Sequence, residues 1–300
     1  MITAAMVKEL RERSGAGMID CKNALTEASG DVERAVELLR EKGLSAIAKK
    51  AGRVASEGIS YATVEGDLGI IVEVNSETDF VAKNSDFTSF VADVAKQIAR
   101  SSTTDVEDLL KEKWINDSTI TVEDALSQKI SVIGEKLSIR RFQKYVAQGT
   151  IVTYIHSGGK VAVILELTGS ESPQLTECGK NVAMQIAAMN PQFIDRSQVP
   201  GDYISKEKEI LTKQALEEGK PANIVEKMVE GRINKNLQAI CLVDQEYVKD
   251  GDLTIQKYLE QVSKEVGHDV KIAKFTRYET GEGIEKKEEN FAEEVRKSMG

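Results

Sequence analysis

Residues 121–134, TVEDALSQKISVIG, recur in similar form 133 positions later, as TIQKYLEQVSKEVG at 254–267. At the same offset, without a gap, three further positions coincide: Ile139 with Ile272, Phe142 with Phe275, and Tyr145 with Tyr278. Self-similarity at one fixed register is the sequence signature of an internal repeat. The body of the chain is therefore predicted to be a duplication.

The copies also match upstream, at a smaller offset. VAKQIA at 94–99 corresponds to VAMQIA at 182–187, which lies 88 positions later. Each match follows an apolar segment, 69–74 or 161–167, which predicts a buried strand preceded by a turn and an earlier strand. Each copy thus predicts antiparallel strands with helices on one side, an α+β arrangement. We expect core subdomains at 55–148 and 149–279.

The second copy is predicted to contain an insertion. The offset grows from 88 to 133, a difference of 45 residues, and the extra segment falls at about 200–243. Two helical patterns, 203–218 and 222–240, flank the turn Gly219-Lys220-Pro221, and proline suits the start of the second helix. Each has one narrow apolar stripe, which predicts an antiparallel coiled-coil hairpin. Such an arm adds little to a core, so a binding role is favoured over a purely structural one.

The ends of the chain predict two smaller modules. Residues 1–54 contain three short helical patterns, broken at Gly15-Ala16-Gly17 and Ser29-Gly30-Asp31, followed by a helical or mobile linker. Three helices in about 40 residues resemble ubiquitin-associated domains, which usually bind a protein surface, although a purely structural head is the alternative. Residues 280–300 are expected to form a short C-terminal helix.

The connection ETDFVAKN at 77–84 lies between a predicted strand and a helix that starts near Ser85. Loops at such places often carry binding or catalytic residues. Phe80 is a large aromatic residue with polar neighbours, so it either folds back onto the core or is presented to a partner. The second copy has TGSESP at the equivalent place, 168–173, without an aromatic residue. Because a core role would be shared by both copies, the second interpretation is favoured.

Composition excludes several classes of function. The net charge of −9 disfavours a broad nucleic-acid surface, which needs positive charge. The sequence contains no apolar run of about 18 residues, so no membrane span is expected, and the N-terminus has no signal-peptide pattern. The widely spaced cysteines, Cys21, Cys178 and Cys241, indicate reduced thiols and a cytoplasmic location.

Catalytic and cofactor motifs are also missing from the sequence. With two histidines and no Cys-x-x-Cys, a zinc site is not expected, and no phosphate-binding glycine motif precedes a helix. Gly158-Gly159-Lys160 reads as a hairpin turn. A thiol dyad of Cys178 and His156 is the weak enzymatic alternative, since Cys178 lies in an apolar helix and is expected to pack. We therefore expect a binding protein with no cofactor and no metal.

Four segments resemble the elongation factor Ts family. They are VKELRERSGAGMIDCK at 7–22, TDFVAKN at 78–84, PANIVEKMVEG at 221–231 and GEGIEK at 281–286. The resemblance covers essentially the whole chain and implies a guanine nucleotide exchange factor of translation elongation. Such a factor binds elongation factor Tu carrying GDP, promotes GDP release and allows GTP to load. The alternative is a ubiquitin-associated-like adaptor without exchange activity.

The resemblance also implies which residues act. Thr78, Asp79, Phe80 and Val81 match the motif that displaces Mg²⁺ from the partner, with Phe80 as the wedge. Positions matching partner contacts are Lys22, Ile133, Gly134, His156, Val248 and Lys249. YVKD at 247–250 departs from the Pro-Phe-Val common in the family, so the contact at Lys249 is open. Ile133 and Gly134 could instead share a packing role with Val266 and Gly267. No nucleic acid or membrane is implied as a partner.

Overall fold

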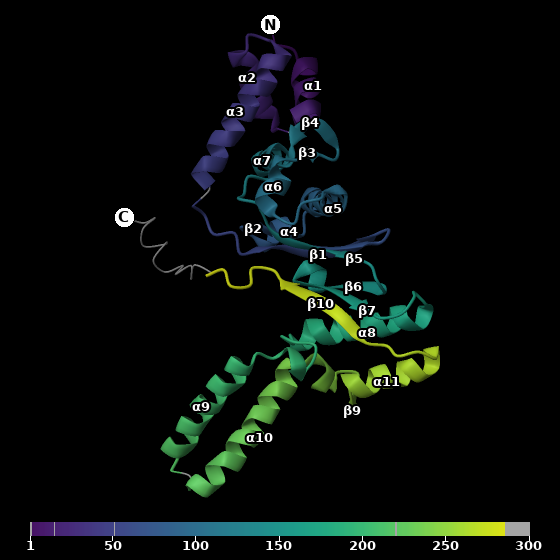
Figure 1. Cartoon of the computed structure of the whole chain (residues 1–300). Helices are drawn as coiled ribbons and strands as arrows, with labels where there is room; N and C mark the ends of the chain where they lie inside the picture. The colour runs from purple at the N-terminus through teal and green to yellow at the C-terminus, as the bar shows by residue number, and fades with distance from the viewer. Residues whose placement is uncertain (1, 15, 51, 220, 286–300) are drawn as a thin grey trace.

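The computed structural model describes residues 2–14, 16–50, 52–219 and 221–285. The chain begins with three helices, α1 (Ala4–Ser14), α2 (Met18–Glu27) and α3 (Val32–Lys50), at the top of Figure 1. They enclose a small core of their own that includes Leu10, Cys21 and Leu25. The three predicted helices are present, and Asp31 caps the third by accepting from Arg34 N at 3.1 Å. The segment expected as a linker after Gly43 is mostly a continuation of α3.

The first copy contains three main strands and the helices that cover them. In chain order its elements are β1 (Glu57–Glu65), β2 (Leu68–Ser76), α4 (Asp79–Ala82), α5 (Ser85–Arg100), α6 (Val106–Lys111), β3 (Lys113–Trp114), β4 (Asp117–Thr121), α7 (Val122–Ile133) and β5 (Ser138–Val146). The antiparallel sheet has the order β1-β2-β5, and β3 pairs with β4 in a separate small hairpin.

The second copy repeats this plan. Its elements are β6 (Thr150–His156), η1 (Ser157–Gly159), β7 (Val161–Leu167), α8 (Pro173–Met189), η2 (Arg196–Gln198), η3 (Leu242–Asp244), β8 (Glu246–Tyr247), β9 (Asp250–Thr254), α11 (Ile255–Val266) and β10 (Ile272–Glu279). The sheet order is β6-β7-β10. Elements β8, β9 and α11 follow β3, β4 and α7 at the predicted offset of 133, so the duplication is confirmed.

The repeated helix begins and ends with the same residue types in both copies. Thr121 and Thr254 cap the N-termini of α7 and α11, each accepting a hydrogen bond from a backbone N–H three residues later. Gly134 and Gly267 end the helices with φ of 84° and 78°, a left-handed conformation that favours glycine. The short hairpins β3-β4 and β8-β9 were not predicted, because strands this short carry no readable alternation.

The two sheets pack face to face, with the helices outside. Alternate residues of β7 face opposite ways: Val163 and Leu165 belong to the core beneath α8, whereas Ala162 and Ile164 pack against the other sheet. Gly69 of β2 permits this approach, since an added Cβ would lie 2.5 Å from Ile164 Cδ1. Figure 1 shows the resulting order of layers, helices, sheet, sheet and helices. The predicted placement of helices on one side of each sheet is confirmed.

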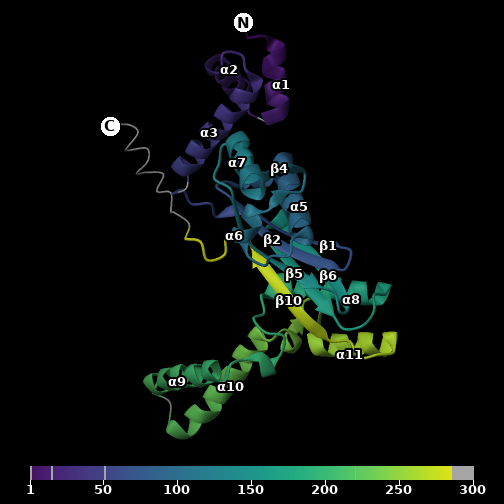
Figure 2. The same cartoon turned by 45° about the horizontal axis from the view of Figure 1, so that its top comes forward.

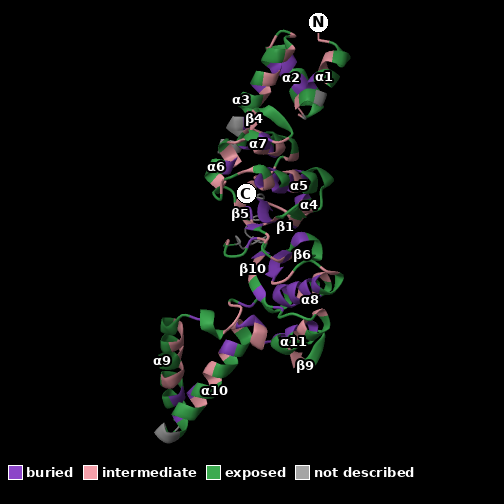
Figure 3. Cartoon of the chain, turned by 45° about the vertical axis from the view of Figure 1, so that its right-hand side comes forward, coloured by how far each residue is buried: buried purple, intermediate pink, exposed green. Residues whose placement is uncertain are grey.

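The insertion forms a helical hairpin that projects from the second copy. Helices α9 (Gly201–Glu217) and α10 (Ala222–Ile240) run side by side away from the body (Figures 1 and 2). Among the described residues, a narrow seam is buried between them, with Ala215, Val225 and Val229 in one cluster and Leu237 of α10 in a second. In Figure 3 most of the arm is exposed or half-buried, whereas the sheets and the inner faces of α5 and α8 are buried.

The end of the described chain returns to the sandwich. Gly281 N donates to Glu73 Oε1 at 2.8 Å, and Arg140 Nη2 donates to Glu282 O. The predicted C-terminal helix falls mainly on residues 286–300, which lie outside the described residues. Within the described part of the chain, no helix is long and apolar enough to cross a membrane.

Candidate functional site

The helical turn α4 presents one aromatic side chain and buries its neighbour. It follows β2 directly and contains Asp79, Phe80, Val81 and Ala82. Val81 is 9% exposed and packs in the core of the first copy, whereas Phe80 is 79% exposed. The interpretation that Phe80 folds back onto the core is therefore wrong. The structure agrees with the favoured interpretation, in which Phe80 is displayed.

The residue before Phe80 carries an ionised carboxylate. Asp79 Oδ2 accepts from Lys83 Nζ at 2.7 Å, one helical turn away. This hydrogen bond, with the charges of Lys83 and Lys160, keeps the pKa of Asp79 below its usual value of 3.8. Asp79 is therefore negatively charged at neutral pH. The turn presents an apolar ring and an anion together.

Lys160 of the second copy forms an ion pair with the first copy near the start of β1. It follows η1, the connection between β6 and β7, and its Nζ lies 2.6 Å from Glu57 Oε2 of the first copy. Gly159 lies against Ile59 of β1, where an added Cβ would come within 2.7 Å of Ile59 Cγ2. His156, at the end of β6, is exposed, and its Nδ1 lies 3.0 Å from Tyr154 OH. The connection that follows His156 therefore lies against β1, the strand that α4 also contacts.

The end of α7 also reaches the turn. Glu135, which follows Ile133 and Gly134, accepts hydrogen bonds from Thr78 N at 3.0 Å and Thr78 Oγ1 at 2.7 Å. Gly134 is exposed, whereas Ile133 is half-buried and packs against the core of the first copy. Val266 packs against the second core in the same way, so the packing role shared by both copies is confirmed for Ile133. Its contact with a partner stays a prediction.

Three predicted contact residues lie elsewhere. Lys22 is exposed on α2, beside a shallow apolar groove lined by Val7 and Met18. Val248 and Lys249 lie in the turn between β8 and β9. Lys249 Nζ donates to Asn181 of α8 at 2.7 Å. Figure 1 places the head on one side of α4 and β9 on the other, beside α11. The candidate site therefore consists of a cluster around α4 and two separate places, one at Lys22 and one at Val248 and Lys249.

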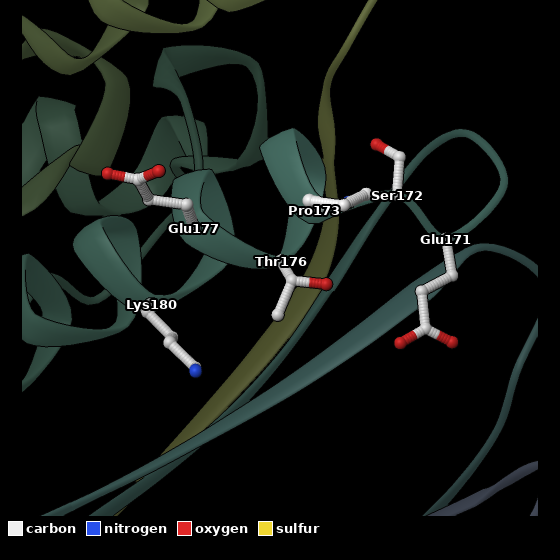
Figure 4. A pocket seen from close by; sticks show the side chains of 6 residues that line it. All are labelled: Glu171, Ser172, Pro173, Thr176, Glu177 and Lys180. Carbon is white, nitrogen blue, oxygen red and sulfur yellow. The ribbon is translucent and has the colours of Figure 1, made fainter.

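The second copy has a surface hollow at the place equivalent to α4. Asn84 and Ser172 cap the equivalent helices α5 and α8 through their side-chain oxygens. In the second copy the preceding loop carries no helical turn, and Figure 4 shows the hollow there, lined by Glu171, Ser172, Pro173, Thr176, Glu177 and Lys180. It contains no aromatic side chain. The displayed phenylalanine is thus specific to the first copy, as the sequence indicates.

The proposed thiol dyad is wrong. Cys178 is buried in α8, and burial raises the pKa of its thiol to about 12, so the thiol is protonated at neutral pH. His156 is exposed on β6 and pairs with Tyr154 instead. Among the described residues, no group of histidine, cysteine and carboxylate side chains is arranged to hold a metal ion.

Two residues near the turn were missed by sequence reasoning, Glu135 and Lys160. Both are charged residues in loops: Glu135 bonds to Thr78, the residue before α4, and, beside the hydrogen bond from Lys83, the charge of Lys160 lowers the pKa of Asp79. The repeat offers no usable signal for Glu135, because its equivalent 133 residues later, His268, differs as most matched positions of the two copies do.

Comparison with known proteins gives the family. A sequence model described as Elongation factor TS matches residues 77–282. The Elongation factor Ts of Clostridium kluyveri is 56% identical over 303 residues, covering 100% of this chain and 99% of that protein. That of Clostridium perfringens (strain SM101) is 56% identical over 304 residues, covering both chains fully, and that of Clostridioides difficile (strain 630) is 53% identical over 301 residues, covering 99% of each. The chain therefore belongs to the elongation factor Ts family of translation elongation factors.

Proposed function

We propose that this protein is the guanine nucleotide exchange factor of elongation factor Tu, acting in the cytoplasm. It binds elongation factor Tu carrying GDP, promotes GDP release and leaves the partner free to load GTP. Thermodynamically, the factor stabilises the nucleotide-free partner, and reciprocity requires that bound nucleotide weaken the factor's own binding by the same ratio. The observation that carries this proposal is the displayed Phe80, in a chain that belongs to the elongation factor Ts family.

In the proposed mechanism, Phe80 wedges into the GTP-binding domain of the partner beside the Mg²⁺ site. Its exposure of 79% leaves the ring free to be buried by another protein, and such aromatic anchors dominate many interfaces. Asp79 adds a negative charge that is complementary to cationic groups near a nucleotide site. Thr78 and Val81 fix the ends of the displayed pair. Disturbed Mg²⁺ coordination then lowers the affinity for GDP.

The remaining contacts are proposed to spread over a long surface. Ile133, Gly134 and His156 flank the turn, and we assign them to the same contact with the GTP-binding domain. Lys22 in the head, and Val248 with Lys249 below, make two further contacts with the partner. The ubiquitin-associated-like character of the head and the coiled-coil character of the arm are part of this proposal, and neither nucleic acid nor membrane takes part in it.

The alternative function is that of a protein-binding adaptor without exchange activity. One observation favours it: Met18 and Ile19 of the head are 60% and 75% exposed, as on a docking surface. The two functions differ in one measurable consequence. An adaptor binds its partner without changing nucleotide kinetics.

Release of fluorescently labelled GDP from elongation factor Tu separates them. We expect the protein at micromolar concentrations to accelerate release, with a rate that rises with its concentration and then saturates. A second expectation is that partner copurified with this protein lacks nucleotide. Unchanged release at every concentration, with binding detected separately, would establish the adaptor instead.

A further inference from the structure

The turn that displays Phe80 is not capped by its own residues. Thr78 is the N-cap residue of α4, and threonine there usually accepts a hydrogen bond from a backbone N–H of the first turn. Here its side chain makes no cap hydrogen bond. Its hydroxyl donates instead to Glu135 Oε1 at 2.7 Å, 57 residues along the chain. The start of α4 is therefore fixed from outside.

The carboxylate of Glu135 also accepts hydrogen bonds from the backbone before α4. Glu135 Oε2 accepts from Glu77 N at 3.1 Å and from Thr78 N at 3.0 Å. In return, Glu77 Oε1 accepts from Lys136 N at 2.6 Å. Two neighbouring pairs, 77–78 and 135–136, thus hold each other by four hydrogen bonds, a group that we call the clamp.

A turn of this size needs such support. Isolated helices are marginal below about 12–15 residues, and α4 spans four. Within α4, Val81 is buried in the core and Ala82, half-buried, packs against the same core. These contacts hold the C-terminal half of the turn, whereas Asp79 and Phe80 at its N-terminal half are not buried. The clamp supplies the point of attachment at the N-terminal end.

The clamp is confined to the copy that displays an aromatic residue. The repeat equivalent of Glu135 is His268, whose ring lies against Gly169, where an added Cβ would come within 2.4 Å of His268 Cε1. The strand end there is held by Thr168, whose N donates to Lys271 O at 2.9 Å and whose Oγ1 donates to Asp269 O at 3.2 Å and accepts from Lys271 N at 2.8 Å. Both copies thus tie the strand end to the segment after the repeated helix. Only the copy with the displayed turn does so through a carboxylate.

From this geometry, and on the basis of the proposed exchange function, we propose that Glu135 is a positioning residue for the Asp79–Phe80 turn. It acts through Thr78 and Glu77, without touching the nucleotide. By fixing the turn before the partner arrives, it lowers the entropy that docking Phe80 would otherwise lose. The predicted consequence is a faster productive encounter with the partner.

The first test compares Glu135→Ala and Glu135→Gln with the control Glu112→Ala. Glu112 likewise accepts two side-chain hydrogen bonds in the first copy, from Gln97 and Ser101, at the opposite end of α5. Glutamine can accept the two backbone bonds with its oxygen and donate its amide N–H to the threonine hydroxyl. We therefore expect Gln to retain most of the function that Ala loses.

Two readouts are used on the full-length protein. Amide hydrogen exchange over residues 77–84 of the free protein is expected to quicken about tenfold or more in Glu135→Ala, the effect of lost hydrogen bonds to a charged group. The slope of GDP release against factor concentration is expected to fall by a similar factor, with Gln close to the wild type. Glu112→Ala should alter neither quantity, even where its melting temperature falls as far.

Glu77→Ala provides a second variant that leaves Glu135 in place, should Glu135→Ala fail to fold. It removes one of the four bonds of the clamp, that from Lys136 N, together with the Arg53–Glu77 ion pair, and should shift both readouts in the same direction. Wild-type exchange slopes and wild-type amide protection in folded Glu135→Ala or Glu77→Ala would overturn the proposal. If the wild-type protein itself does not accelerate GDP release, the exchange function fails, and amide exchange alone decides whether Glu135 fixes the turn.

Discussion

Val81 and Phe80 are neighbours with opposite environments: Val81 is buried in the core of the first copy, and Phe80 points into solvent from the same helical turn. The buried residue is an anchor, and the exposed one is available to a partner. This arrangement separates stability from function at adjacent positions. The two residues should therefore respond differently to truncation.

Phe80→Ala should leave the free energy of unfolding within about 0.5 kcal/mol of the wild type, because an exposed ring contributes little to the fold. Val81→Ala should lower it by about 1–3 kcal/mol, since two buried methyl groups are lost. Urea unfolding followed by circular dichroism measures both. Val146→Ala, another exposed apolar residue, serves as the control for Phe80. A large loss of stability in Phe80→Ala would mean that the ring packs on the body.

Glu73→Gln should destabilise the junction between the two copies. Glu73 is fully buried and accepts from Arg141 Nε at 2.6 Å, Arg140 Nη1 at 3.0 Å and Gly281 N at 2.8 Å. Breaking a buried pair costs roughly 3–5 kcal/mol, and the partial exposure of both arginines reduces this to about 1–3 kcal/mol. Denaturant unfolding measures the loss. Glu65→Gln, on the exposed end of β1, is the matched control and should behave as the wild type.

The carboxylates of Glu73 and Glu166 should make the thermal stability of the protein fall in acid. Burial raises the pKa of each, but hydrogen bonds from backbone N–H groups and neighbouring basic side chains outweigh it, so both pKa values lie below the usual 4.5. A depressed carboxylate pKa stabilises the fold above the unfolded value and loses that effect as pH falls through the folded value. We expect the melting temperature to drop below about pH 4.5.

The acid effect has a specific control. The double variant Glu73→Gln, Glu166→Gln lacks both groups and should show a flatter dependence of melting temperature on pH between about 5 and 3. An unchanged slope in the double variant would assign the acid sensitivity to other carboxylates. The two glutamates are paired with Arg141 and Lys274, which are themselves equivalent positions of the repeat, 133 residues apart.

Two glycines should respond in opposite directions to alanine. Gly69→Ala inserts a methyl group 2.5 Å from Ile164 between the sheets, and overpacking of this kind costs about 1–3 kcal/mol. Gly231 lies inside α10, where an added Cβ would meet no atom within 4 Å apart from the helix's own backbone. Gly231→Ala should therefore stabilise the arm by about 0.5–1 kcal/mol. Thermal unfolding of the two variants compares the signs. A stabilised Gly69→Ala would show that the sheets are more loosely packed than described.

The sequence was sufficient for features that repeat or have a period. The matched segments predicted α7 and α11, and the change of offset predicted the hairpin of α9 and α10. It was insufficient for contacts between loops. The bonds between Thr78 and Glu135 join residues with no local pattern, and the approach of Lys160 to Asp79 depends on how the sheets stack. Face-to-face packing is set by Gly69, Ala162 and Ile164 together, which no single segment reveals.

The measurement that bears most directly on the proposed mechanism is GDP release from elongation factor Tu, with wild-type protein and Phe80→Ala compared at equal concentrations. Loss of a well-buried aromatic anchor weakens an interface by roughly 2–4 kcal/mol, a factor of tens to several hundreds. We therefore expect rapid release with the wild type and release close to the spontaneous rate with Phe80→Ala. Acceleration by Phe80→Ala equal to that of the wild type would contradict the role of the displayed ring.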